Sequence, residues 1–200
     1  MNYKVGFVDN SFDLLSDYYT RLTRYDIEIL FPKAGMSKDE ILQWVLNNDI
    51  RCLLIDHKLN PDFSYIGTDL LAYINSRLPD LPCLILTAYM PESQKENLVI
   101  KNLIESRDLL EASGIAPFAE KLKQAVDVFN KRLDLHETEY RSLLEVKKNG
   151  TIVAKQEERL DYLYSLLRSY GVVDDIPTVF LKPEMEKKID LLIEKLDNIP

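Results

Sequence analysis

Three short apolar runs that end in polar residues constrain the fold of this chain more than any other feature. They are Tyr3–Asp9, Cys52–Asp56 and Cys83–Thr87. The middle run is apolar at every position before its aspartate, which is typical of a central strand buried on both faces of a parallel sheet. Helical periodicity separates the runs, and this alternation implies right-handed crossovers between parallel strands. The sequence therefore predicts an α/β fold.

Further strands and helices follow from the same reasoning. Ile27–Phe31 reads as a second strand, and Ser37–Glu40 is a capping-box signature that opens a helix. For a fifth strand we favour Leu103–Ser106, although Leu98–Ile100 would also serve. The apolar pattern thus supplies five strands with a helix between most neighbours.

The C-terminal part of the chain has a helical pattern without strands. A stripe of apolar residues at four- and three-residue steps runs over 118–143 and is stopped by Asn149-Gly150. A second helix is expected from Ile152 to Tyr170, and a third after Pro183. We therefore expect a domain over 1–130 and a helical output or interaction region over 131–200, continuous with the last helix of the domain.

Composition and charge narrow the range of partners. The net charge is −8, with 11 Lys+Arg against 18 Asp+Glu up to Glu120 and 14 against 15 beyond it, so neither part is basic. A phosphate-neutralising surface is therefore not expected, and nucleic acid is not a predicted partner. No apolar run approaches the ~20 residues of a membrane span, and no signal-peptide pattern is seen. Cys52 and Cys83 lie within apolar runs and read as reduced core residues of a cytoplasmic protein.

Polar side chains at the ends of three predicted strands suggest a site. Asp9 and Asn10 follow the first strand, Asp56 follows the third, and Thr87 ends the fourth. Ligands of open parallel sheets bind outside the carboxyl ends of the strands, so we expect these groups to meet there. Carboxylate and amide oxygens could hold Mg²⁺, and a hydroxyl across the site could receive a phosphoryl oxygen.

This set resembles the receiver domain of two-component response regulators. The resemblance covers roughly Tyr3 to Asn130, through Val8–Ser11, Leu54–Lys58 and Leu86–Ala88, with a glycine and helix at Gly67–Leu71. It implies a flavodoxin-like, doubly wound sheet of five parallel strands in the order 2-1-3-4-5.

The resemblance also implies roles for individual residues. Asp56 would be the phosphoacceptor, attacking a phosphohistidine of a sensor histidine kinase. Thr87 would be the switch hydroxyl. Mg²⁺ would be bound by Asp9, Asn10, Asp56 and the backbone carbonyl of Lys58.

The sequence departs from the family pattern at several points. Asn10 stands where the family usually has a second acid, so we expect Mg²⁺ affinity to be weaker by roughly tenfold or more. The loop between Asp56 and Gly67 is longer than usual. The lysine that the family places after its fifth strand has no clean match. We favour Arg107 in that role over Lys182, and Lys101 is a third candidate. The neighbour of the predicted phosphoacceptor, His57, is expected to face solvent.

The predicted site is compatible with three candidate functions. The first is a phosphoacceptor response regulator, not an enzyme beyond Mg²⁺-dependent self-phosphorylation and dephosphorylation at Asp56. Its helical, non-DNA-binding tail would signal through a downstream protein partner, and the 118–143 helix leaves a homodimer open. The second is a pseudo-receiver that acts as an interaction module without phosphorylation. The third, an aspartyl-nucleophile phosphohydrolase, is disfavoured because Lys58 stands where that class carries a second acid.

Overall fold

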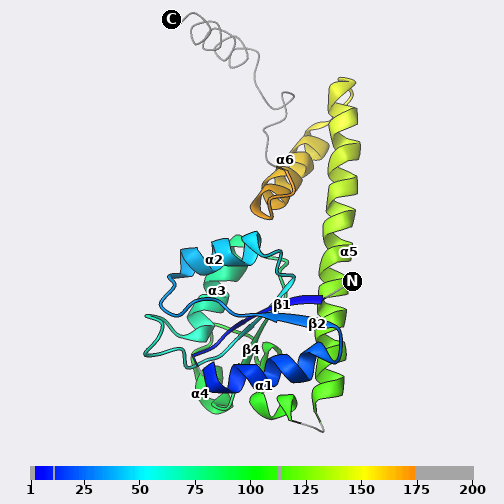
Figure 1. Ribbon diagram of the computed structural model, residues 1–200. Helices are drawn as coiled ribbons and strands as arrows, with labels where there is room; N and C mark the ends of the chain where they lie inside the picture. The colour runs from blue at the N-terminus through cyan, green and yellow to red at the C-terminus, as the bar shows by residue number, and fades with distance from the viewer. Residues whose placement is uncertain (1–2, 11, 112–113, 174–200) are drawn as a thin grey trace, which may run out of the picture. The chain divides into compact units, whose positions relative to one another are not determined.

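Five parallel strands form one sheet in the order β2-β1-β3-β4-β5 (Figure 1). The computed structural model describes residues 3–10, 12–111 and 114–173. The strands are β1 Tyr3–Val8, β2 Ile27–Leu30, β3 Cys52–Ile55, β4 Cys83–Thr87 and β5 Ile104–Ser106. The predicted fold class and strand order are therefore confirmed, and the fifth strand lies in the segment that we favoured.

Helices connect the strands and continue beyond the sheet. The α-helices are α1 Phe12–Thr23, α2 Lys38–Asn47, α3 Gly67–Arg77, α4 Met90–Lys95, α5 Ile115–Lys148 and α6 Ala154–Ser169. Two short 3₁₀ helices flank β5, namely η1 Lys101–Leu103 and η2 Arg107–Leu110. The predicted capping box is present at the start of α2, where the Ser37 hydroxyl and the Glu40 carboxylate each bond the backbone of the other residue.

The two faces of the sheet are covered by different helices because strand side chains alternate between faces. One face contributes apolar side chains of β1, β3 and β4 to a core that also includes residues of α1 and α5. Its members include Phe7, Leu54, Leu86, Leu22 and Phe118. Figure 1 shows α2 and α3 on the opposite side of the sheet from α1. On that side a Cβ at Gly6 would lie 2.8 Å from the Trp44 ring of α2, so the glycine lets the helix approach the strand closely.

Both cysteines are free thiols in this core, as expected. Cys52 and Cys83 are buried, and burial raises the pKa of the Cys52 thiol to about 12. A thiol that stays protonated at neutral pH is a poor nucleophile, so neither cysteine is a candidate for chemistry.

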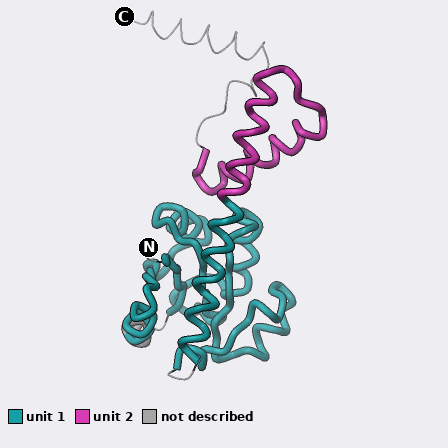
Figure 2. Tube along the Cα trace, turned by 90° about the vertical axis from the view of Figure 1, so that its right-hand side faces the viewer, with its two compact units in different colours: residues 1–133 teal, residues 134–200 magenta. Residues whose placement is uncertain are grey.

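The structure divides into two compact units, residues 1–133 and 134–200 (Figure 2). We predicted a division after residue 130, and both positions lie within α5. That the two parts act as separate functional domains stays a prediction. The apolar residues at the start of the 118–143 stripe, Phe118, Leu122 and Phe129, are buried in the first unit. This part of the stripe is therefore an ordinary core face.

The described part of the second unit, 134–173, is an antiparallel pair of helical segments. Arg159 of α6 makes a bidentate ion pair with Glu139 of α5, at 2.9 and 2.6 Å. The rings of Tyr140 and Tyr164 stack with their centroids 6.5 Å apart. The turn between the helices uses Gly150, whose φ of +68° lies in the left-handed region. The third predicted helix, after Pro183, lies outside the described residues.

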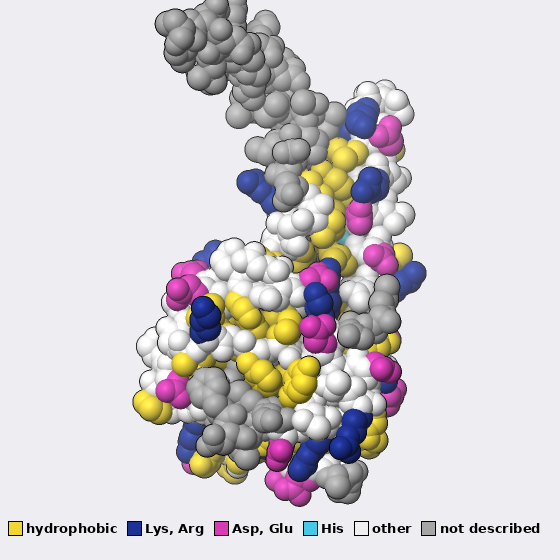
Figure 3. Space-filling model, viewed as in Figure 1, with side chains coloured by type: hydrophobic (Ala, Val, Ile, Leu, Met, Phe, Trp, Pro, Cys, Tyr) yellow, Lys and Arg dark blue, Asp and Glu magenta, His cyan; other side chains and the backbone are white. Residues whose placement is uncertain are grey.

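Charged side chains of both signs are interspersed on the face of the molecule that Figure 3 shows. Among the residues that the structure describes, no helix is both long enough and apolar enough to cross a membrane.

Candidate functional site

Two buried aspartates lie side by side at the carboxyl edge of the sheet. Asp9 follows β1 and Asp56 follows β3, and the two strands pair in parallel with Val8 opposite Ile55. The Asp56 amide continues the ladder by donating to the Val8 carbonyl at 2.8 Å. Only 2% of Asp9 and 4% of Asp56 is exposed. Two carboxyl groups this close and this buried can both be ionised only beside a positive charge, because each raises the cost of ionising the other.

Arg107 supplies that charge. It is the first residue after β5, and its Nη2 atom lies 2.7 Å from Asp9 Oδ2 and 3.0 Å from Asp56 Oδ1. One guanidinium therefore bridges both carboxylates, with its side chain only 15% exposed. Of the other candidates for this place, Lys101 is exposed in η1, and Lys182 lies outside the described residues. The structure thus brings Arg107 to Asp56, while its role in any reaction stays a prediction.

Thr87 brings a hydroxyl to the same edge. It is the last residue of β4 and is fully buried. Its Oγ1 accepts a hydrogen bond from the Tyr89 amide at 3.1 Å, and its hydroxyl lies close enough to Asp56 to lower the pKa of that carboxyl slightly. The side chain therefore links the aspartate to the loop that leads into α4.

The protonation of Asp56 reflects these neighbours. Burial raises the pKa of the Asp56 carboxyl above its ordinary value, because desolvation disfavours the charged form. The Arg107 guanidinium opposes this rise in pKa, and the Asp9 carboxylate adds to it. Arg107 is thus the largest influence that keeps Asp56 ionised, and an ionised carboxylate is the form that can act as a nucleophile.

Of the residues expected to hold Mg²⁺, Asp9 and Asp56 contact Arg107, and the binding of Mg²⁺ stays a prediction. The Asn10 amide nitrogen donates to the Asn60 carbonyl at 2.9 Å. Arg107 occupies the space between the two carboxylates, and the described residues contain no cluster of three or more acids, histidines or cysteines that could hold a metal. Lys58 is exposed, and its ammonium group makes a 2.8 Å ion pair with Glu92. The positive charge beside the two carboxylates in this structure is the guanidinium of Arg107.

A glycine lets the following helix start directly beside the phosphoacceptor candidate. Gly67, the first residue of α3, donates its amide to the His57 carbonyl at 2.9 Å. A Cβ at this position would lie 1.9 Å from the backbone oxygen of Asp56, closer than any real contact. Only glycine fits this approach, which fixes the backbone around Asp56.

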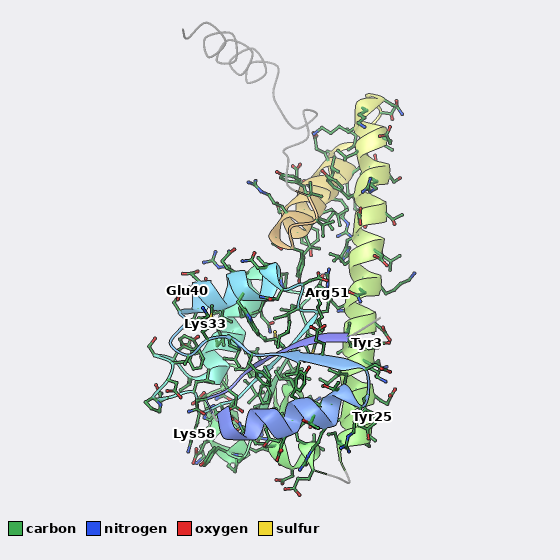
Figure 4. All side chains as sticks on the ribbon, viewed as in Figure 1. Tyr3, Tyr25, Lys33, Glu40, Arg51 and Lys58 are labelled. Atoms are coloured by element: carbon green, nitrogen blue, oxygen red, sulfur yellow. The ribbon has the colours of Figure 1, made fainter. Side chains whose placement is uncertain are left out.

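The expectation that His57 faces solvent is wrong. His57 is 4% exposed, and its Nε2 lies 3.6 Å from Glu96 Oε1, just beyond α4. The other Glu96 oxygen accepts a hydrogen bond from the hydroxyl of Thr68 in α3. Lys58, labelled in Figure 4, adds a second contact to this region, with its Nζ 3.4 Å from the Tyr89 ring centroid. The sequence carried no signal for these contacts, because Glu96 is far along the chain and side-chain packing decides the pairing.

A cleft of about 810 Å³ opens beside the acid pair, between α1 and the segment that joins β5 to α5. Arg107 lines it together with Tyr18, Arg21 and Glu111. Arg21 Nη1 donates to the Leu110 carbonyl at 2.9 Å. Burial raises the pKa of the Tyr18 hydroxyl, and the charge of the nearby Arg107 opposes this rise. The guanidinium of Arg107 therefore lies between the carboxylates and an open space.

This fold is that of the receiver domains of response regulators. No family model and no curated protein matches the sequence. Among solved structures, NtrX from Brucella abortus is similar with a TM-score of 0.53 and 17% identity, over 68% of this chain and 30% of the NtrX chain. The signal receiver domain of an HD domain-containing protein from Pseudomonas fluorescens Pf-5 is similar with a TM-score of 0.51 and 16% identity, over 66% of this chain and 91% of that one.

Proposed function

We propose that this chain is a receiver-type signalling protein in which Asp56 accepts a phosphoryl group and the helical region signals through protein contacts. The supporting observation is the convergence of the Asp56 carboxylate, the Thr87 hydroxyl and the Arg107 guanidinium at one sheet edge. These are a nucleophile, a hydrogen-bond donor and a fixed positive charge, which together suit a transferred phosphoryl group. The fold similarity supports the same class of protein.

In the proposed reaction an Asp56 oxygen attacks the phosphorus of a phosphohistidine on a sensor kinase. The phosphorus–nitrogen bond breaks, the imidazole leaves, and an acyl phosphate forms on Asp56. The new group carries a charge of about −1.5 to −2, which Arg107 and the Thr87 hydroxyl are placed to stabilise. Beyond this self-modification and its reversal, no enzymatic activity is proposed.

The change at Thr87 would reach the surface through the loop that follows it. The Thr87 hydroxyl holds the Tyr89 amide, so a hydroxyl that turns to a phosphoryl oxygen would release this bond. Tyr89 is 45% exposed and also lies against the Lys58 ammonium. A downstream protein that contacts this loop or the helical region would then distinguish the two states. A cytoplasmic location, where a kinase could deliver the phosphoryl group, belongs to the same proposal.

Incubation with acetyl phosphate, with and without Mg²⁺, tests the proposal by intact mass. The expected result is a gain of one phosphoryl group by the natural protein and no gain by Asp56→Asn. Asp62→Asn is a matched control, because it removes an acid from the loop after β3 without touching the site. An unchanged mass for the natural protein under all conditions would refute phosphoryl transfer.

A second candidate function is a pseudo-receiver that binds its partner without phosphorylation. The observation that favours it is Arg107, which already makes ion pairs with both carboxylates, while the Asn10 amide nitrogen donates to a loop carbonyl. With one guanidinium beside two ionised carboxylates the site carries a net charge of −1 instead of −2, which reduces its need for a bound cation. This candidate predicts that Asp56→Asn leaves partner binding unchanged, whereas the phosphoacceptor proposal predicts that it removes the response to the phosphodonor.

A further inference from the structure

The acid pair contacts an internal cation, the guanidinium of Arg107. One nitrogen of Arg107 lies within 3.0 Å of an oxygen from each carboxylate, and the oxygens come from two different strand ends. All three side chains are mostly withdrawn from water, with exposures of 0%, 6% and 15% for Asp9, Asp56 and Arg107. The contact with Asp9 is a charge-assisted hydrogen bond, a kind about twice as strong as a neutral one, whereas the contact with Asp56 Oδ1 is an ion pair.

A divalent cation and the guanidinium cannot share this position. A dication that binds both carboxylates would lie within a few ångströms of Arg107, and the like charges would repel each other even at an effective dielectric constant of about 20. The Asn10 side chain is neutral, so unlike a second acid it adds no negative charge that would offset this repulsion. Metal binding therefore requires that Arg107 leaves the carboxylates first.

The cleft beside the site gives Arg107 a place to go. Its side chain lines both the acid pair and the cleft, and its Nε has no hydrogen-bond partner among the described residues. The cleft also contains the exposed carboxylate of Glu111, which could pair with a displaced guanidinium. Movement of the Arg107 side chain into the cleft would thus let a divalent metal ion replace the guanidinium at the two carboxylates.

We infer that Arg107 is the resident cation of this site, that it replaces a divalent metal at rest, and that it competes with any metal for Asp9 and Asp56. The inference concerns the regulation of the site in the proposed function, but it does not require that Asp56 is phosphorylated. It makes the resting structure independent of Mg²⁺. It also makes Arg107, and not the loss of an acid at Asn10 alone, the main obstacle to metal binding.

Mn²⁺ binding to the full chain tests this inference, measured by the electron paramagnetic resonance signal of free Mn²⁺ and by calorimetry with Mg²⁺. Arg107→Gln is the main variant because it keeps hydrogen-bonding capacity without the charge. We expect it to bind either ion at least about tenfold more tightly than the natural protein, since removal of a nearby unit charge ends the repulsion. Arg107→Gln combined with Asp56→Asn should lose this gain.

The matched control is Arg21→Gln, which removes a charge from the same cleft. Arg21 bonds the Leu110 carbonyl, so its loss should leave metal affinity at the value of the natural protein. If Arg107→Gln does not fold, as judged by circular dichroism, Arg107→Met replaces it. Methionine keeps an unbranched, flexible side chain without the charge, so metal affinity should rise as it does in Arg107→Gln.

Equal affinity in the natural protein and the Arg107 variant would overturn the inference, as would an equal gain from Arg21→Gln. The acetyl phosphate experiment tests the proposed function independently. If Asp56 is not phosphorylated but Arg107→Gln binds metal more tightly, the proposed function is refuted and this inference stands. If Asp56 is phosphorylated but Arg107→Gln binds metal no more tightly than the natural protein, the inference is refuted and the proposed function stands.

Discussion

Replacement of Arg107 by alanine should destabilise the first unit strongly and in a pH-dependent way. In the natural protein the guanidinium lies 2.7 and 3.0 Å from oxygens of Asp9 and Asp56. Unit charges ~4 Å apart interact by about 4 kcal/mol at an effective dielectric constant of about 20. Desolvation of the arginine offsets part of the attraction, and removal of one partner from a buried ion pair costs about 3–5 kcal/mol. We expect a loss in this range at about pH 8.

The sign of the pH dependence follows from Asp56. Burial already raises its pKa, and loss of Arg107 removes the main opposing influence, so its folded pKa rises further. A carboxyl group with a raised folded pKa favours the folded state at pH values below its unfolded pKa, and this advantage is lost as pH rises through the folded pKa. The deficit of Arg107→Ala relative to the natural protein should therefore be largest at about pH 8 and smaller at about pH 5.

Urea denaturation followed by the fluorescence of Trp44, the single tryptophan of the chain, measures this difference. Trp44 lies in α2 beside Gly6 of β1 and reports on the first unit. The same substitution in an Asp56→Asn background should cost less, because only one carboxylate is then left unpaired. An equal loss at both pH values, or an equal loss in both backgrounds, would refute the reasoning.

Three further predictions concern the scaffold of the site and the second unit. Gly67→Ala should destabilise the first unit by about 3 kcal/mol, because the new methyl group meets the Asp56 carbonyl, and the same denaturation experiment measures it. Ser37→Ala removes the cap of α2 and should cost about 1 kcal/mol; a loss as large as that of Gly67→Ala would contradict the assignment of a local cap. Leu163→Ala creates a cavity in the buried face of α6 and should cost about 3 kcal/mol in the unfolding of the second unit, followed by helical circular dichroism, with the exposed Tyr162→Ala nearly neutral.

The similarity of the fold to receiver domains was predictable because the pattern of buried strands is local. Runs such as Cys52–Ile55 are apolar throughout, and a parallel sheet is the structure that buries such strands on both faces. Once the strands are parallel, their carboxyl ends share one edge, so Asp9, Asp56 and Thr87 had to come together. The sequence therefore determined the parallel sheet and the place of its acidic residues. The order of the strands followed from the resemblance to receiver domains.

The tertiary structure decided what surrounds those residues. From the sequence, Arg107 was one of three candidates for the basic residue beside Asp56. The position of β5 decided between them, because Arg107 directly follows this strand and so reaches both carboxylates. The burial of His57 against Glu96 and the bond from Asn10 to Asn60 carried no local signal at all. Such contacts depend on side-chain packing between segments far apart in the chain, whereas the strands depend on hydrophobic periodicity within a few residues.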